Sequence, residues 1–469
     1  MIGGYCFTYS FAESVSKVAP WSQIGTDEAT NPPGPARGQF APTSRPEGTV
    51  ELEPSVLRTA AQPISRACAV PPVGHEEHHW LAENNGTASR AAMAAASGFY
   101  KSTVPAQIAD LTIDLPAVLA ADAEEAAAEL SRFDEHARSR LGSGSPALGP
   151  MSAILLRTES ASSSQIENLT AGARQLALAE IGQSTSDNAA IVTANVRTME
   201  AALRLADDLD EQAILAMHRE LLSAQPGWSD HAGRYREQLV WVGSSSITPR
   251  GAAHVGPQAE LVPGAMRDLT AFVRRQDMQV VAQAAIAHAQ FETIHPFTDG
   301  NGRTGRALVH AMVRAKGLVK NTTAPISAGL LINTTGYTDA LGAYRGGDAR
   351  PIIERFSEAS RFAARSGANL VDQLAWQIDE AERALRSIKL RPQAVAWKVL
   401  PHLVAQPVIN ARYLEHRFGI AAPTAQRALS QLTEAEVLVE RTGLKRNRIW
   451  QHSGILAVLD AYAAQLRRH

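Results

Sequence analysis

The stretch 295–306 of this 469-residue chain reads HPFTDGNGRTGR. It places one imidazole, one carboxylate, an amide, two guanidinium groups and three glycines within a few turns of backbone. Guanidinium groups bind phosphate oxygens, and an imidazole can accept a proton near neutral pH. The residue types therefore indicate a site that binds a polyphosphate and deprotonates a group placed beside it.

The three glycines determine how closely the backbone can approach an anion. Gly300, Gly302 and Gly305 carry no Cβ. A helical repeat of apolar residues follows Gly302, namely Ala307, Leu308, Ala311, Met312 and Ala315. We therefore expect a helix N-terminus here, where free N–H groups favour an anion. Arg303 and Arg306, three residues apart, would project from one face of its first turn.

Two further side chains of the stretch 295–306 suit proton transfer and metal binding. Asp299 is a hard anionic ligand, of the kind that holds Mg²⁺ together with substrate phosphates. His295 has an ordinary pKa of about 6.5, so it can serve as a general base.

The stretch resembles the signature of the Fic family, His-x-Phe-x-Asp/Glu-Gly-Asn-Gly-Arg-x-x-Arg, at every specified position. Family members typically transfer AMP from ATP to a hydroxyl side chain of a target protein. The resemblance implies that His295 takes the proton of a Ser, Thr or Tyr hydroxyl. It further implies that Asp299 holds Mg²⁺ at the α- and β-phosphates.

The same resemblance assigns the rest of the loop. It implies an anion hole formed by Gly300, Asn301 and Gly302, with Phe297 anchoring the loop in the core. Arg303 and Arg306 would hold the β- and γ-phosphates.

A second motif lies upstream, at 163–168, with the sequence SSQIEN. It resembles the inhibitory motif of Fic proteins, Ser/Thr-x-x-x-Glu-Gly/Asn, through Ser163, Glu167 and Asn168. The resemblance implies that Glu167 pairs with Arg306 and denies it to the γ-phosphate. Alternatively, Ser164 and Glu167 form a capping box that opens a helix. The two roles compete for one carboxylate.

Two regions between and beyond these motifs also resemble the family. The β-rich stretch 238–243 and the stretch 253–257 predict a hairpin. In Fic enzymes such a flap binds the target peptide as an added strand, here through Leu239, Val240, Trp241 and Val242. A surface hairpin with no docking role is the alternative. Tyr337 would flank the adenine, or it is a packed aromatic.

Composition limits the class of protein. The net charge is −2, so the chain has no overall attraction for nucleic acid or membranes. Its alanine-rich apolar content favours a largely helical protein, and no stretch is long and apolar enough to span a membrane. No signal peptide is evident, and Cys6 and Cys68 both fall outside the expected folded body. We therefore expect a cytoplasmic protein without disulfides or a zinc site.

The predicted fold class is mainly α, a Fic-type helical domain with a small hairpin flap and a C-terminal winged helix-turn-helix. The expected domains are a disordered extension (1–78), a helical segment (79–150), the catalytic domain (151–370), a helical linker (371–391) and the winged helix (392–469). Further helices are expected at 187–207, 210–221, 264–275 and 279–291. The histidines at 75, 78 and 79 are expected in a solvated loop rather than a metal site.

The C-terminal region 392–451 reads as helices followed by a β-rich tail, and it resembles a winged helix-turn-helix. Its recognition helix would be 423–433 and its wing 442–447. The possible DNA contacts are Arg427, Lys445, Arg446 and Arg448. Acidic residues lie close to them, and winged helices also dock proteins, so DNA and protein partners both stay open.

The sequence thus favours a self-inhibited protein adenylyltransferase (AMPylator). It would use ATP and Mg²⁺ to modify a target protein with an exposed hydroxyl. Self-modification and a homodimer are further possibilities. A DNA-binding regulator that senses nucleotide is one alternative, although it would not need His295. A Fic enzyme that removes AMP, with Glu167 positioning a water, is the other.

Overall fold

The computed structural model describes residues 68–469 except 83–88, 142–144, 224, 226, 244–246, 443–446 and 468–469. The described residues belong to one compact unit. Residues 1–67, most of the extension that the sequence predicts to be disordered, lie outside the described part.

The described chain is mainly helical with three small antiparallel sheets, as the sequence predicts. The helices are α1 (Arg90–Ala96), α2 (Ala117–Leu141), α3 (Leu148–Ile166), α4 (Ala173–Glu180), α5 (Asp187–Arg204), α6 (Glu211–Leu222), α7 (Val262–Val273), α8 (Val280–Ile294), α9 (Asn301–Ala315), α10 (Ile326–Leu331), α11 (Thr334–Arg345), α12 (Arg350–Ser387), α13 (Val395–Val399), α14 (Ala411–Phe418), α15 (Ala422–Glu434) and α16 (Ser453–Leu466). The strands are β1 (Gly74–Trp80), β2 (Gly98–Val104), β3 (Trp241–Val242), β4 (His254–Val255), β5 (Val408–Ile409), β6 (Val439–Glu440) and β7 (Trp450–Gln451).

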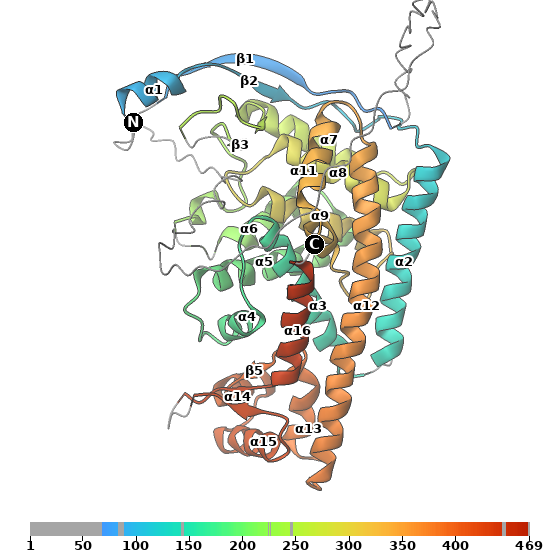
Figure 1. The fold of residues 1–469 in the computed structure, drawn as a ribbon, viewed down its shortest axis with the longest axis vertical. Helices are drawn as coiled ribbons and strands as arrows, with labels where there is room; N and C mark the ends of the chain where they lie inside the picture. Colours follow the sequence, from blue (N-terminus) through green and yellow to red (C-terminus); the bar gives the residue numbers. More distant parts are fainter. Residues whose placement is uncertain are drawn as a thin grey trace, which may run out of the picture. The chain divides into compact units, whose positions relative to one another are not determined.

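Helices α8 and α9 form the centre of the core. Every residue of α8 from Val281 to Ile294 is buried, the polar ones included, which places this helix in the interior. Helix α9 packs against α8, α5 and α6, and the long helix α12 packs against α2, α8 and α10. Figure 1 shows α12 running alongside α2. The loop between α8 and α9, which carries 295–300, is therefore held by two buried helices.

The N-terminal boundary differs from the prediction. Residues 74–80 form β1, which pairs antiparallel with β2, and Cys68 is fully buried rather than outside the folded body. The backbone N–H of Cys68 donates to Asp114, and its carbonyl accepts from Ala349. The helical prediction near residue 100 is wrong because Phe99, Tyr100 and the following β-branched residues favour a strand.

The predicted boundary at 370/371 is also absent. Helix α12 runs unbroken through 371–387, and its buried apolar face continues from Leu370 through Leu374 to Leu385. No glycine or proline interrupts this second half of the helix. The expected linker is therefore part of the core helix.

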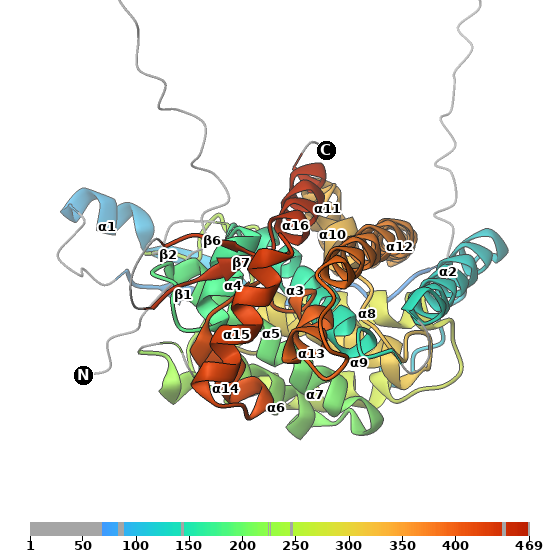
Figure 2. The same cartoon turned by 90° about the horizontal axis from the view of Figure 1, so that it is seen from below.

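The C-terminal segment contains the predicted pair of helices joined by a turn. Gly419, with φ 62°, ends α14, and Pro423 stands in the first turn of α15. The three strands follow the order β5-β7-β6. Figure 2 shows α14 and α15 beside α13. Helix α16 was not anticipated, and it contacts α12 and α4. Among the described helices, none has the length and apolarity to cross a membrane.

Candidate active site

His295 lies where α8 ends. It occupies the left-handed region, with φ 49° and ψ 61°, and its N–H donates to Phe291 at 2.8 Å. A left-handed non-glycine residue is uncommon and often marks a functional site. Gly300, with φ 77°, caps α9, and a Cβ there would lie 2.5 Å from Leu221 Cδ2. The glycine-rich run does lie at a helix N-terminus as predicted, and phosphate binding by it stays a prediction.

The loop is braced by Asn301 at the start of α9 and by His218 of α6. Asn301 Oδ1 accepts from the Phe297 N–H at 2.9 Å, and its Nδ2 donates to the Phe297 carbonyl at 2.8 Å. The ring of His218 stacks on buried Phe297 at 3.7 Å. His218 Nε2 donates to the Asp299 carbonyl at 3.0 Å, and its Nδ1 accepts from Gly233. Burial lowers the pKa of His218 to about 3, so this brace stays neutral.

The imidazole of His295 is oriented as a base. Its Nδ1 lies 3.4 Å from the carbonyl oxygen of Glu292, which can only accept, so Nδ1 carries the proton and Nε2 keeps its lone pair. Burial, assisted by the positive charge of Arg236, lowers the pKa of His295 to about 4. The side chain is therefore neutral and able to accept a proton at pH 7.

Glu292 is a second titratable group in the site, and the sequence did not single it out. Its Oε2 lies 3.6 Å from His295 Nδ1, and its buried Oε1 has no hydrogen-bond partner among the described residues. Burial raises the pKa of Glu292 to about 7. Its charge beside His295 therefore changes near physiological pH.

Arg236 joins the hairpin to the loop between α8 and α9. Its buried guanidinium donates to the carbonyls of His295 at 2.8 Å, Gln238 at 2.8 Å and Pro257 at 2.7 Å. Its backbone N–H donates to Pro296 at 3.0 Å. The sequence does not single out Arg236, which is only one residue of the stretch before the predicted flap. Its contacts are with residues that are distant along the chain.

The predicted hairpin is present next to this loop. Trp241 pairs with Val255 and Val242 with His254, while the Val240 carbonyl accepts from Gly256. Leu239 precedes these strands. The Trp241 side chain is buried, with its ring 5.3 Å from that of Trp80 on β1. Peptide docking through the flap stays a prediction, and the backbone rather than the Trp241 ring would carry it.

The two arginines near the start of α9 bind the upstream motif. Arg306 donates from Nε to Ser163 Oγ at 2.8 Å and from Nη2 to the Ser163 carbonyl at 2.8 Å and Glu167 Oε1 at 2.7 Å. Arg303 Nε lies 2.8 Å from Glu167 Oε2, and its Nη2 donates to Asp299 Oδ2 at 2.9 Å. The sequence predicted the pair with Arg306. The pair with Arg303 is an addition.

Glu167 places its carboxylate at the N-terminus of α9. A Cβ on Gly302 would lie 2.4 Å from Glu167 Oε1 and 2.8 Å from Arg306 Nη1. Burial alone would raise the pKa of Glu167, but Arg303 and Arg306 outweigh burial and hold it below the usual range. The carboxylate is therefore ionised in the place where this helix N-terminus would receive an anion.

The capping-box alternative for Ser164 and Glu167 is wrong. Both residues lie at the C-terminal end of α3, where Ser164 Oγ donates back to the Ser160 carbonyl and Glu167 is the C-cap. The next helix, α4, begins only at Ala173. Asn168 has φ 61°, a conformation that glycine and asparagine tolerate best. This backbone requirement explains Asn168 at the end of the motif.

Gly305 and Tyr337, which are both predicted to contact the nucleotide, lie in the core. A Cβ on Gly305 would lie 2.9 Å from Phe291 Cδ1, so this glycine allows α8 and α9 to pack closely. Tyr337 is 4% exposed, and its hydroxyl lies 2.6 Å from His288 Nε2. A nucleotide contact by either residue stays a prediction.

Asp299 fits a magnesium ion that is shared with a nucleotide. Its carboxylate is close to the N-terminus of α9, and Arg303 binds one of its oxygens. No cluster of three His, Cys, Asp or Glu residues occurs within the described ranges. One carboxylate plus substrate phosphates is an ordinary way to hold Mg²⁺.

The possible DNA contacts do not join this site. Arg427 is exposed on α15, and Arg448 pairs with Glu440 and lies over the Trp450 ring at 4.7 Å. Lys445 and Arg446 lie outside the described residues. The Glu440 pair offsets the charge of Arg448, which weakens the case for a phosphate contact there.

Residues 208–313 match a family model described as the Fic/DOC family. The chain is 32% identical over 176 residues to protein adenylyltransferase fic-1 of Caenorhabditis elegans, which covers 34% of this chain and 32% of that protein. It is 31% identical over 163 residues to protein adenylyltransferase Fic of Nematostella vectensis. This match covers 34% of this chain and 32% of that protein. The matches therefore span about a third of these curated relatives.

Solved structures show weaker likeness. A Fic family protein from Desulfovibrio desulfuricans G20 has a TM-score of 0.44 and 23% identity, covering 73% of this chain and 97% of that one. Residues 134–508 of Fic-1 from Caenorhabditis elegans have a TM-score of 0.42 and 22% sequence identity. This match covers 54% of this chain and 74% of that one. The sequence matches show a Fic/DOC region with homologues among the protein adenylyltransferases.

Proposed function

We propose that this chain, with its Fic/DOC region, is a self-inhibited protein adenylyltransferase that transfers AMP from ATP to a Ser, Thr or Tyr hydroxyl of a target protein. The observation that carries the proposal is the double ion pair of Glu167 with Arg303 and Arg306 at the N-terminus of α9. A carboxylate in an anion site beside a neutral imidazole supports both an anionic substrate and a means of blocking it.

His295 would act on the hydroxyl of the target. The hydroxyl oxygen attacks the α-phosphorus, the bond from that phosphorus to pyrophosphate breaks, and the hydroxyl proton passes to Nε2 of His295. Backbone N–H groups in the first turn of α9 would face the phosphates. Asp299 would hold Mg²⁺, which neutralises phosphate charge when bound.

Glu167 would block the γ-phosphate in the resting state. It occupies both guanidinium groups that a β- or γ-phosphate needs, and its negative charge repels phosphate oxygens. ATP would then bind without its terminal contacts, in a pose unsuited to in-line attack. Release of Glu167 would free both arginines together.

Incubation of the Glu167→Gly variant with ATP and Mg²⁺, followed by intact-mass analysis, tests the proposal. One AMP group added to the chain or to an added protein supports transfer. A variant that adds no AMP, but strips AMP from a pre-modified protein, would replace this activity with the removal reaction. Nucleotide binding with neither activity would favour the sensing alternative.

For the C-terminal segment we propose a winged helix-turn-helix that docks a protein rather than DNA. The element order and the antiparallel β6–β7 pair support a winged helix, and the Arg448–Glu440 ion pair favours a protein partner. A homodimer through this or another surface stays a prediction.

The pH dependence of transfer should report the depressed pKa of His295. Neutral imidazole is the active form, so with a pKa of about 4 it persists above that pH and is lost as the pH falls through it. The Glu167→Gly variant should keep more than half of its pH 8 rate at pH 5.5. An imidazole with an ordinary pKa of about 6.5 would keep about a tenth.

Glu292 provides the control for that profile. Because its pKa is about 7, its protonation can add a step near neutrality. Replacing Glu292 with glutamine should remove any such step from the pH profile. The transfer rate should then stay level from pH 8 to pH 5.5. A rate that still falls about tenfold between pH 8 and pH 5.5 in the Glu292→Gln background would contradict a base with a depressed pKa.

A further inference from the structure

Helices α3 and α9 meet through polar contacts at three successive turns. Glu159, Ser163 and Glu167 recur every four residues of α3, so they share one face. Ser163 and Glu167 bind Arg306 and Arg303 at the start of α9. Glu159 forms the third contact, further along α9 and away from the anion site.

The Glu159 contact joins three helices. Its side chain is fully buried, and Oε1 lies 2.7 Å from Nε2 of His310 on α9. Oε2 accepts from the N–H of Ser327 on α10 at 2.9 Å, and the Ser327 hydroxyl donates to Oε1 at 2.5 Å. A buried carboxylate with these partners holds α3 in one register against α9, because any shift would leave it unpaired.

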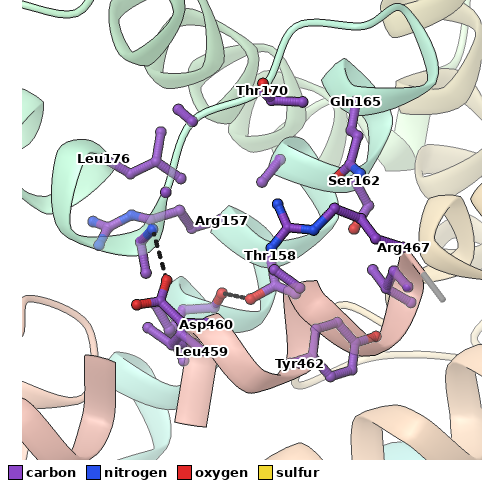
Figure 3. A pocket seen from close by; sticks show the side chains of 17 residues that line it. Arg157, Thr158, Ser162, Gln165, Thr170, Leu176, Leu459, Asp460, Tyr462 and Arg467 are labelled. Atoms are coloured by element: carbon purple, nitrogen blue, oxygen red, sulfur yellow. Dashed lines mark hydrogen bonds between the residues drawn. The ribbon is translucent and has the colours of Figure 1, made fainter. Parts of the chain in front are cut away.

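The opposite face of α3 borders a pocket, although Arg157 on this face donates to the Ala405 carbonyl at 2.6 Å. A pocket of about 180 Å³ separates part of this face from α16. Its lining from α3 consists of Ile154, Arg157, Thr158, Ala161, Ser162 and Gln165. Figure 3 shows Thr158, Ser162 and Gln165 of α3 on one side of the pocket, and Leu459 and Tyr462 of α16 on the other. The pocket opens partly to solvent, and it leaves α3 room to shift away from α9 on this side.

We propose that Glu159 is a positioning residue that keeps α3, and with it Glu167, in the blocking position. This inference rests on the proposed function, because it concerns the state in which Glu167 covers the two arginines. Eight residues of helix separate Glu159 from Glu167, or about 12 Å. Glu159 therefore does not touch the nucleotide site, and it acts there through the placement of α3 against α9.

Glu159→Gln keeps the side-chain shape but removes the charge and one acceptor. We expect self-labelling by ATP to rise about fivefold over the wild type and affinity for a fluorescent ATP analogue to increase. The rise should be smaller than that of Glu167→Gly, because Asn195 also holds α3 through Ser160 and Ser164. In a Glu167→Gly background, the added Glu159→Gln change should give no further rise.

Asp134→Asn is the matched control. Asp134 is another buried carboxylate, and it lies on α2. It accepts hydrogen bonds from the backbone N–H groups of Lys320, Asn321 and Thr322, just before α10. Its loss should destabilise the protein without raising labelling or nucleotide affinity. Thermal unfolding of both variants separates general loosening from release of α3.

Three results would overturn the inference. One is Glu159→Gln labelling at the wild-type level while Glu167→Gly labels strongly, which leaves the proposed function intact. Another is an equal rise in Asp134→Asn. The third is a further rise when Glu159→Gln is added to Glu167→Gly. If neither glutamate variant labels but Glu159→Gln still binds the ATP analogue more tightly, the proposed function fails and the positioning role stands.

A milder variant covers the case in which Glu159→Gln does not fold. Ser327→Ala removes the hydroxyl donor to Glu159 and leaves the backbone N–H in place. We expect a rise in labelling of about threefold that disappears in the Glu167→Gly background. No rise in Ser327→Ala would then contradict the role of Glu159.

Discussion

Replacing Glu167 with glycine should raise self-labelling from ATP by at least about tenfold, which corresponds to about 1.4 kcal/mol of relieved competition. The reason is that one carboxylate occupies two guanidinium groups, with Nε of Arg303 at 2.8 Å and Nη2 of Arg306 at 2.7 Å. Both become available to phosphates when it is removed. The measurement is the initial rate of label uptake at equal protein concentration.

Two variants show whether the gain comes from freeing the arginines. Glu167→Gln keeps the side-chain length but loses the charge, so it should label at an intermediate rate. Arg306→Ala removes the inhibitory pair and the γ-phosphate contact together, and it should therefore stay weakly active. Equal labelling by wild type and Glu167→Gly would refute inhibition by Glu167.

Replacing His295 with alanine in the Glu167→Gly background should lower the rate of AMP transfer by about 10²–10⁴-fold, the usual cost of losing a general base. The loss should be in the chemical step, because the imidazole contributes its Nε2 lone pair to proton removal and no donor to the phosphates. Affinity for ATP should change by less than about threefold. Single-turnover rates and nucleotide titration measure the two quantities.

His254 offers a matched control for that loss. It is a buried neutral histidine, its ring lies 6.3 Å from that of His295, and its Nε2 donates to the Thr293 carbonyl. The His254→Gln change perturbs the packing around His295 without removing the base. The transfer rate of this variant should fall less than tenfold. A comparable loss in both variants would mean that packing around the loop, rather than proton transfer, limits the rate.

The parts of the site that could be predicted are those encoded locally. Gly300 and Gly302 precede a helical repeat, so the helix N-terminus follows from the sequence itself. The hairpin at 241–255 likewise follows from β-branched and aromatic residues around a turn-rich break. The pairing of Glu167 with Arg306 required the family resemblance, because 139 residues separate them.

The remaining contacts depend on how distant segments pack. His218 reaches the Asp299 carbonyl across 81 residues, and Arg236 reaches the His295 carbonyl across 59. No local pattern distinguishes them from other buried polar residues, and the same holds for Glu292. Strand β1 was missed because its partner β2 was read as helix, and β-propensity depends on such pairing.

The most direct measurement compares two forms of labelled ATP on the Glu167→Gly variant, one with the label on the α-phosphate and the other on the γ-phosphate. AMP transfer predicts covalent α-label on protein, no γ-label, and loss of the α-label when His295→Ala is added. Uptake of γ-label, or of neither label with an added panel of hydroxyl-bearing protein substrates, would contradict a protein adenylyltransferase.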